Sequence, residues 1–414
     1  MKTRKTAALT AAFLLAATAG HAQTAPTTIE ELWEIVQRQQ AEIDELREAL
    51  GEARQEVAAA SDRIVETEAR VDATGDYVET LAVADSGASG TSIGGYGELH
   101  YNRIRADAGD TDEIDFHRFV LFVNHEFTDR VRFFSELELE HSLAGDGAPG
   151  EVELEQAYVE YALTDDTFAK TGLFLLPLGI INETHEPTTF YGVERNDVES
   201  IIIPSTWWEA GAGLNGRFAN GLSWDLGLHS GLAMPTTGGS AFRVRSGRQK
   251  VAEADASDWA YTARLKYTGM RGLELAASYQ YQSDPSQVAG DGLDTGQLLT
   301  AHAIFQRGGF GLRALYAGWR FDGFAVEAAG ADEQDGWYVE PSYRFSDKWG
   351  IYARYEDVDA ARDQDKFTQN EFGINYWPVP GVVLKIDYRI RDHSLSALAD
   401  EDFDAIDLGF GYNF

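Results

Sequence analysis

Apolar and polar residues alternate in short segments from Thr91 to the end of the chain. Segments such as "YGELHYNRIR", "VRFFSELELEHS" and "GLELAASYQYQ" carry an apolar side chain at nearly every second position. A period of two is that of a β-strand with one apolar and one polar face. The pattern predicts sixteen strands, centred near residues 98, 120, 137, 157, 171, 211, 227, 262, 277, 302, 315, 340, 352, 372, 386 and 408.

The connections between these segments alternate in length. Long loops such as "ADAGDTDEID", "AGADEQDG" and "LADEDFD" stand between tight turns. This alternation is typical of an outer-membrane barrel, whereas nothing would impose it on a soluble β-sandwich. We therefore predict an all-β membrane barrel of about sixteen antiparallel strands over residues 96–414. The tight turns are "TDR" (128–130), "TDD" (164–166), "ANG" (219–221), "GMRG" (269–272), "RGG" (307–309), "SDK" (346–348) and "PVPG" (378–381).

The last segment, "AIDLGFGYNF", has one apolar face that ends on an aromatic residue, Phe414. A barrel in lipid must turn such a face outward, with aromatic side chains at the two membrane interfaces. The predicted location is the cell outer membrane of a Gram-negative bacterium, in contact with lipid and lipopolysaccharide. Aromatic girdles are expected from Trp259, Tyr261, Tyr267, Trp337, Tyr343, Trp349 and Tyr355.

A different period runs through residues 29–81. Apolar side chains recur every seven residues for eight heptads, which predicts a periplasmic α-helical coiled coil over residues 23–85. The second apolar set weakens after Leu46, and an amphipathic helix folded onto its own domain is the alternative. A coiled coil needs partner helices, so a homotrimer is expected. The first set is Ile29, Val36, Ile43, Leu50, Val57, Ile64, Val71 and Val78.

The composition of the remaining segments indicates what they are. Residues 1–22 combine early basic residues with an apolar run too short to span a bilayer, and so predict a signal peptide. Residues 86–95 are rich in Gly and Ser and predict a linker. The chain has no cysteine, and its formal net charge of -34 argues against a nucleic-acid partner.

Turning the apolar faces outward sends charged side chains into the barrel. A polar, wetted interior is expected, although an ion pair between neighbouring strands is the alternative explanation for any single charge. The segment "FHRFVLFVNHEF" is apolar on both faces, as in a strand pressed against a neighbouring subunit. The predicted pore-wall residues are Arg118, Glu136, Glu138, Arg264, Arg344, Arg354, Lys385, Arg389 and Arg391.

One connection, over residues 177–204, is much longer than the tight turns. Sixteen strands leave a lumen too wide for side chains to fill, so this loop can fold inward as a constriction. Its apolar run Ile201–Ile203 favours that position over an exposed cell-surface loop. Acidic loop residues are expected to face wall arginines across the opening. The predicted constriction residues are Glu183, His185, Glu186, Tyr191, Glu194, Arg195 and Asp197.

Several stretches are similar to one known family. The chain from "DFHRFVLFVNHEFTDRVRFFSELELE" through "GLFLLPLGIINETHEPTTFYGVERNDVESIIIPSTWWEAGAG" to the terminal "YNF" resembles the phosphate-selective porin O and P family. The resemblance implies a sixteen-stranded, trimeric outer-membrane channel whose third loop folds inward. Glu194-Arg195 matches a pair inside that loop, but Leu175 stands where the family commonly has lysine.

These observations predict a porin, a passive channel for small hydrophilic solutes or inorganic ions. The alternatives are a phosphate- or anion-selective channel and a structural tether between outer membrane and cell wall. No enzyme activity is expected, because the histidines are scattered and no nucleophile motif accompanies them. No metal site or cofactor is predicted either, since the acidic run "DAGDTDEID" is better explained as solvated. The basic stretch "AFRVRSGRQK" (241–250) is either an anion funnel or a lipopolysaccharide-facing patch.

Overall fold

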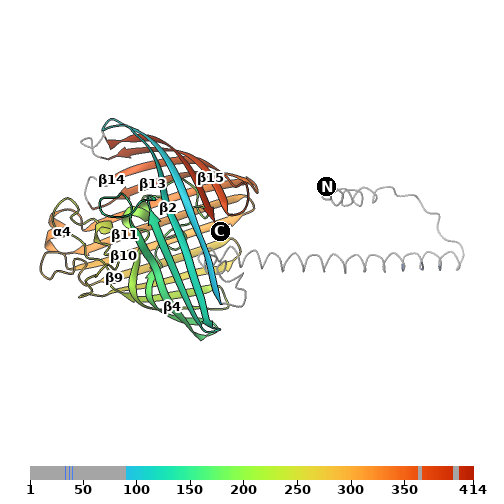
Figure 1. The fold of residues 1–414 in the computed structure, drawn as a ribbon, viewed down its shortest axis with the longest axis horizontal. Helices are drawn as coiled ribbons and strands as arrows, with labels where there is room; N and C mark the ends of the chain where they lie inside the picture. Colours follow the sequence, from blue (N-terminus) through green and yellow to red (C-terminus); the bar gives the residue numbers. More distant parts are fainter. Residues whose placement is uncertain (1–32, 34–36, 38–39, 41–89, 362–365, 395–400) are drawn as a thin grey trace. The chain divides into compact units, whose positions relative to one another are not determined.

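The computed structural model describes residues 33, 37, 40, 90–361, 366–394 and 401–414. Residues 90–414, apart from these gaps, form a closed barrel of sixteen antiparallel strands in which each strand pairs with its neighbours in sequence (Figure 1). Every predicted strand centre falls inside a strand. The strands are β1 (Thr91–Ala106), β2 (Thr111–Thr128), β3 (Val131–Glu140), β4 (Val152–Thr164), β5 (Thr167–Leu175), β6 (Trp208–Arg217), β7 (Leu222–His229), β8 (Ala260–Met270), β9 (Leu273–Gln282), β10 (Thr295–Arg307), β11 (Phe310–Asp322), β12 (Glu333–Ser346), β13 (Trp349–Asp359), β14 (Lys366–Tyr376), β15 (Val382–His393) and β16 (Phe403–Asn413).

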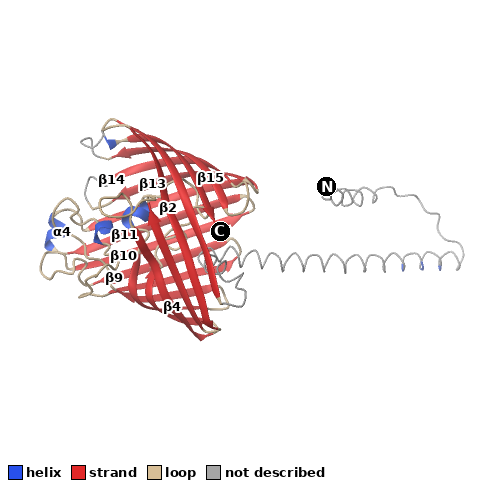
Figure 2. Ribbon diagram, viewed as in Figure 1, coloured by secondary structure: helices blue, strands red, loops and turns tan. Residues whose placement is uncertain are grey.

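The first and last strands close the barrel. β1 pairs with β16 from Tyr96 opposite Asn413 to Ala106 opposite Phe403. Beyond that ladder, the backbones of Gly95 and Phe414 exchange two hydrogen bonds of 2.9 Å each. Closure satisfies the edge groups that would otherwise lie unpaired in lipid. Short helices in the described part of the long loops (Figure 2) include the π-helix η2 (Val198–Ile202), the 3-10 helix η3 (Val244–Gly247) and α4 (Phe324–Ala328).

The domain boundaries differ in part from those predicted. β1 begins at Thr91, so residues 91–95 of the predicted linker 86–95 are strand. They pair with β2 from Thr91 opposite His125. Glycine here allows a close approach of strands, since a Cβ at Gly95 would clash with the Val120 carbonyl oxygen. The predicted signal peptide 1–22 and nearly all of the predicted coiled coil 23–85 lie outside the described residues. Within that arm, Trp33, Gln37 and Gln40 are helical and exposed.

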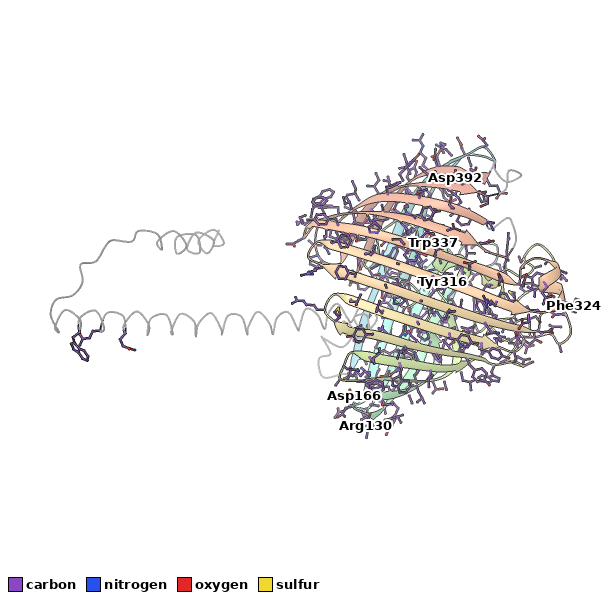
Figure 3. The ribbon with its side chains drawn as sticks, turned by 180° about the vertical axis from the view of Figure 1, so that it is seen from behind. Arg130, Asp166, Tyr316, Phe324, Trp337 and Asp392 are labelled. Carbon is purple, nitrogen blue, oxygen red and sulfur yellow. The ribbon has the colours of Figure 1, made fainter. Side chains whose placement is uncertain are left out.

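The outer surface is apolar, as the strand parity predicts. On β16, Ile406 and Leu408 are exposed while Asp407 between them is fully buried. The girdle pairs Trp337–Tyr355 and Trp349–Tyr376 have ring centroids 5.3 and 4.4 Å apart. Figure 3 shows Tyr316 and Trp337 on the outer wall, Arg130 and Asp166 at the rim of short turns, and Phe324 at the opposite end. No helix among the described residues is both long and apolar enough to cross a membrane.

Part of the lumen is filled by an apolar core. Side chains of β10–β14 such as Leu298, Trp319 and Tyr338 pack there against residues of five long loops. Loop residues of this core include Ile202, Ile203, Phe242 and Val326. The core therefore fixes one side of the interior, while charged residues gather elsewhere along the wall.

Candidate constriction of the barrel lumen

The segment between β5 and β6, residues 176–207, forms a closed loop that turns into the barrel; we call it the constriction loop. Its two ends are tied together by Asn182. The side-chain amide of Asn182 donates to the carbonyls of Leu176 (2.8 Å) and Trp207 (2.9 Å), and its Oδ1 accepts from the Trp207 N–H (2.6 Å). Asn182 is fully buried, so these bonds satisfy polar groups that water cannot reach.

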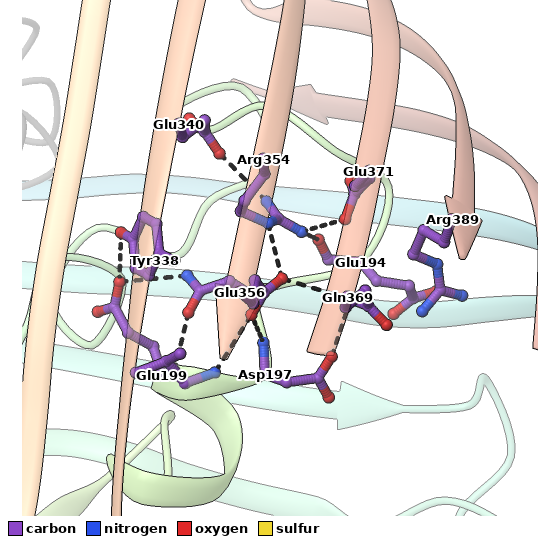
Figure 4. A network of polar contacts seen from close by, with 12 residues as sticks. Glu194, Asp197, Glu199, Tyr338, Glu340, Arg354, Glu356, Gln369, Glu371 and Arg389 are labelled. Carbon is purple, nitrogen blue, oxygen red and sulfur yellow. Dashed lines mark hydrogen bonds and ion pairs between the residues drawn. The ribbon is translucent and has the colours of Figure 1, made fainter. Parts of the chain in front are cut away.

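Buried carboxylates fasten the loop to β12 and β13. Glu199 accepts hydrogen bonds of 2.6 Å from the N–H groups of Ile180 and Ile181, and one of 2.8 Å from the Tyr338 hydroxyl. Glu356 of β13 accepts from the Asp197 N–H at 2.7 Å. Figure 4 shows these groups converging from the loop and from neighbouring strands. Inside the barrel, each carboxylate accepts hydrogen bonds from backbone N–H groups that would otherwise bond to water.

The loop also contacts β15 and β16. Lys385 donates to the Gly192 carbonyl (2.6 Å), and Asp387 accepts from the Val193 N–H (2.6 Å). A side chain at Gly411 of β16 would place its Cβ 2.5 Å from Pro187. The inward-facing glycine therefore leaves the space that the loop occupies.

On the other side, His185 reaches β3 and β4. Its Nε2 lies 3.2 Å from a carboxylate oxygen of Glu136 and 3.4 Å from one of Glu155. Burial alone would lower the pKa of His185, but these two carboxylates raise it to about 10, so the imidazole is protonated at neutral pH. Its ring also packs edge-on against Tyr96, at 5.9 Å between centroids. In a ring of sixteen strands, β4 and β12 lie on opposite sides, so the loop spans the lumen.

The inward apolar residues of β2 have a structural explanation. Val120 and Phe122 form a small buried cluster with Tyr96. Tyr96 in turn contacts His185 of the loop, so the inward-facing apolar residues of β2 support the constriction loop through Tyr96. A neighbouring subunit is not needed to cover the inward face.

The predicted loop residues lie inside the barrel, but most have direct partners. Glu183 forms an ion pair with Arg264, and Asp197 with Arg391. Tyr191 packs against Tyr352, at 5.2 Å between ring centroids.

Glu194 and Glu186 differ in their surroundings. Glu194 accepts from Asn102 (2.9 Å) and lies 3.1 Å from His100. Burial favours the neutral form of Glu194, but His100 holds its pKa well below the usual range. Burial raises the pKa of Glu186 to about 7.

The predicted pore-wall cations do not face an opening in the way expected. Arg389 pairs with Asp407, and Arg354 is buried among Glu340, Glu356 and Glu371. These cations, like Arg391, pair with carboxylates of a neighbouring strand or of the loop, whereas Lys385 donates to a loop carbonyl. Arg344 is exposed near a short turn, 4.2 Å above the Trp377 ring, and thus belongs to the rim.

The charges that do oppose one another were only partly predicted. Arg195 belongs to the loop, while Glu138 and Glu155 are buried, inward-facing residues of β3 and β4. Neither carboxylate oxygen of Glu138 has a hydrogen-bond partner in the described part of the chain, and its ion pair with Arg118 is long, at 3.6 Å. Nε and Nη2 of Arg195 are likewise buried without a hydrogen-bond partner among the described residues. At this place the acidic side chains belong to the wall and the basic side chain to the loop, whereas the Glu183–Arg264 and Asp197–Arg391 pairs have the opposite arrangement.

Two further arginines join this group from the loop between β7 and β8. Arg245 donates to the Ser205 carbonyl (2.7 Å) and the Ser200 carbonyl (3.1 Å) of the constriction loop. Arg248 donates to the Thr206 carbonyl, beside the hydroxyl that accepts from Arg195 at 2.9 Å. The sequence indicated these arginines as part of the basic stretch 241–250, but their contact with the constriction loop depends on the fold. The stretch therefore turns toward the lumen.

A vestibule of 820 Å³ lies on the short-turn side of the loop, within β2–β8. Turn residues Asp129 and Gly221 line its outer part, and Glu183, His185 and Glu186 of the constriction loop line it as well. Charged wall residues of both signs, including Arg132, Glu160 and Lys266, complete the lining. Water-filled space thus reaches the constriction loop from this rim.

Comparison with known proteins identifies the family. The family model described as "Gram-negative porin" matches residues 190–394, which include the second part of the constriction loop. An uncharacterized protein of Aquifex aeolicus (strain VF5) is 30% identical over 352 residues, covering 73% of this chain and 76% of the relative. The chain belongs to the Gram-negative porins. This porin is accordingly an outer-membrane channel protein.

Solved structures share the fold of the porin. The anion-selective porin from Comamonas acidovorans matches with a TM-score of 0.57 and 12% identity, over 79% of this chain and all 100% of that one. The trimer form of OmpT, an outer membrane protein of Vibrio cholerae, matches with a TM-score of 0.50 and 12% identity, over 78% and 99%. The Gram-negative porin description is broader than the phosphate-selective porin O and P family that the sequence resembles.

Proposed function

We propose that this porin is a passive channel for small hydrophilic solutes and ions, and that the constriction loop sets its narrowest point. The observation that carries the proposal is the set of loop contacts on opposite walls. His185 contacts β3 and β4, while Glu199 contacts β12. A loop held in this way divides the lumen and leaves solutes only the space beside it.

The constriction also separates charge across that space. Glu138 and Glu155 stand on the wall, and Arg195, Arg245 and Arg248 stand on the facing loops. Opposed charges in a narrow, poorly screened region orient dipolar solutes and favour those that carry both signs. Their influence falls with salt, because the screening length decreases from ~10 Å at 0.1 M to ~3 Å at 1 M.

An anion-selective or phosphate-selective channel is the second candidate. The three arginines near Thr206 favour it, and the Comamonas acidovorans porin with the same fold is described as anion-selective. The acidic wall opposes it. Reversal potentials in a salt gradient distinguish the two: a strong anion preference supports this candidate, and a weak preference of either sign supports the first.

The assembly we propose is a homotrimer in outer-membrane lipid and lipopolysaccharide, with the arm at 23–85 as a coiled coil in the periplasm. The eight heptads at 29–81 support this trimer. A coiled coil of three helices has a three-fold axis, and a trimeric barrel has the same symmetry. A tether to the cell wall remains an additional role that this arm could serve.

Single-channel recording in planar bilayers tests the role of the loop. Replacing residues 184–199 by a short Gly-Ser linker should raise the conductance several-fold, because the shortened loop then occupies less of the lumen. Replacing residues 107–110 is the control and should leave conductance unchanged; these four residues connect β1 to β2, because β2 begins at Thr111 and takes up most of the predicted long loop "ADAGDTDEID". If the 184–199 variant assembles and conducts like the parent, the loop is not the constriction.

A further inference from the structure

Three side chains at the long-loop end of β2 and β3 converge on one point. Oδ2 of Asp115 lies 2.8 Å from Nδ1 of His141 and 3.2 Å from Nδ1 of His117. One ligand atom from each of the three residues lies within 4.8 Å of the others. Two imidazole nitrogens and one carboxylate oxygen therefore share one small volume.

A β-bulge builds the first half of this cluster. In the β1–β2 ladder, Glu98 pairs with Arg118 but His100 pairs with Asp115, so β2 holds one extra residue at this place. A bulge bends the strand and redirects a side chain. The ring of His117 consequently stacks on the inward-facing His100, with centroids 4.7 Å apart and planes 11° from parallel.

His141 completes the cluster from the end of β3. Its N–H donates to the His117 carbonyl at 3.1 Å, and its φ of 51° turns the chain back toward β2. The His117 and His141 rings meet edge to face, at 5.6 Å between centroids. Two segments that are separated in sequence thus present their Nδ1 atoms to the same carboxylate.

The neighbouring His100 is not a third imidazole ligand. Its nitrogens lie 3.2 Å from Glu98 and 3.1 Å from Glu194, so both already have carboxylate partners. It supports the His117 ring and connects the cluster to Glu194 of the constriction loop. The side chains of Asp115, His117 and His141 are 16%, 28% and 35% exposed, which leaves them reachable from water.

The donor set decides the class of ion. Ca²⁺ and Mg²⁺ prefer oxygen ligands throughout, whereas imidazole suits Zn²⁺ and its transition-metal neighbours. Zinc takes His nitrogen and carboxylate oxygen at roughly 2.0–2.2 Å, so ligand atoms about 3 Å apart fit one coordination sphere. The nearby acidic run does not compete, because Asp110 and Asp112 form ion pairs with Arg105 at 3.5 and 2.8 Å.

We propose that Asp115, His117 and His141 bind one divalent transition-metal ion of the Zn²⁺ class per chain, at the extracellular approach to the constriction loop. A tetrahedral ion keeps a fourth position open to water or to a passing solute. The bound charge lies beside the His100–Glu194 pair, so it adds positive potential at the entrance. The binding itself does not depend on the proposed role of the loop in conduction.

Direct binding to the full-length porin in detergent tests the site. Isothermal titration with Zn²⁺ should give one ion per chain, and Co²⁺ should give visible d–d absorption bands on binding. His141→Ala and Asp115→Asn should each weaken the affinity at least tenfold and remove the Co²⁺ bands. An excess of Ca²⁺ should not displace the zinc.

His302→Ala is the matched control, because His302 pairs with Glu274 at 2.9 Å inside the barrel without belonging to the three-ligand cluster. It should bind zinc like the parent. Circular dichroism and heat-resistance on gels establish that each variant is folded, and His141→Gln provides a variant of similar size. Absence of zinc binding to the folded parent, or equal affinity in parent and His141 variants, overturns the assignment.

Discussion

The Tyr338 hydroxyl of β12 donates a hydrogen bond of 2.8 Å to Glu199 in the constriction loop, across 139 positions of the sequence. The same carboxylate accepts from the Ile180 and Ile181 N–H groups, so it joins the wall, the start of the loop and η2. Glu199 is fully buried. The loop is therefore anchored by one central acceptor that water cannot replace.

Substitution of this acceptor should loosen the loop more than substitution of its wall donor. Glu199→Ala leaves two buried N–H groups and a hydroxyl without their partner, each at a cost of about 1–3 kcal/mol. Tyr338→Phe removes one hydrogen bond and should cost about 1 kcal/mol. Thermal unfolding gives the order, and single-channel noise should rise in Glu199→Ala. Equal losses in the two variants would show that Glu199 does not act as the shared anchor.

Charge substitutions at the constriction should shift ion preference in opposite directions. Glu138→Gln removes a wall carboxylate and should move the reversal potential toward anions, whereas Arg195→Gln should move it toward cations. Both shifts should shrink at 1 M salt because of screening. Arg320→Gln serves as control, since Arg320 is largely exposed in the outer loop region beside Glu333. Shifts of the same sign in both variants would contradict opposed charges.

Glu186 should make the stability of the porin depend on pH near neutrality. Burial raises its pKa to about 7 in the folded protein, above about 4.3 in an unfolded chain. A raised carboxyl pKa contributes stability that is complete below about pH 4.3 and is lost as pH rises through about 7. The loss is on the order of 4 kcal/mol, at 1.36 kcal/mol per pKa unit.

Melting temperatures of the parent and Glu186→Gln between pH 5 and 8.5 measure this contribution. The difference between the two should change across the range, with the parent losing stability relative to the variant between pH 5 and about 7 and little further change above that. His185 also contributes stability that falls above about pH 6.5, because its pKa is about 10 in the folded protein, but this change is common to the two proteins and cancels in their difference. Parallel curves for the two proteins would mean that Glu186 does not titrate in this window.

Phe414 should matter for assembly more than for conduction. Its backbone exchanges two hydrogen bonds of 2.9 Å with Gly95 at the barrel seam, and its side chain is 62% exposed on the outer surface. Phe414→Ala should lower the amount of barrel in the outer membrane while the assembled fraction conducts normally. Phe345→Ala, which removes another exposed outer aromatic, controls for loss of lipid contact. If Phe414→Ala reaches the outer membrane in the same amount as the parent, Phe414 does not have the proposed role in assembly.

Local sequence determined the wall of this protein. Most strands alternate apolar and polar side chains because lipid lies on one face and the interior on the other, and this period is visible in most segments taken alone, β2 being an exception. Turn lengths follow from the same local pattern, as at residues 128–130 and 346–348. Asp407 is buried while its neighbours Ile406 and Leu408 are exposed, so the alternation of side chains in the sequence matches their alternation in burial.

Tertiary structure decided the contents of the lumen. The sequence shows that Arg391 points inward, but not that Asp197 meets it there, because loop closure brings together groups 194 positions apart. Arg245 joins Arg195 only after two loops fold over the same opening. The Asp115–His117–His141 cluster likewise depends on a bulge in β2 and a turn after β3. Pairing across space selects which inward charges remain unpaired, and periodicity along the chain contains no information about such partners.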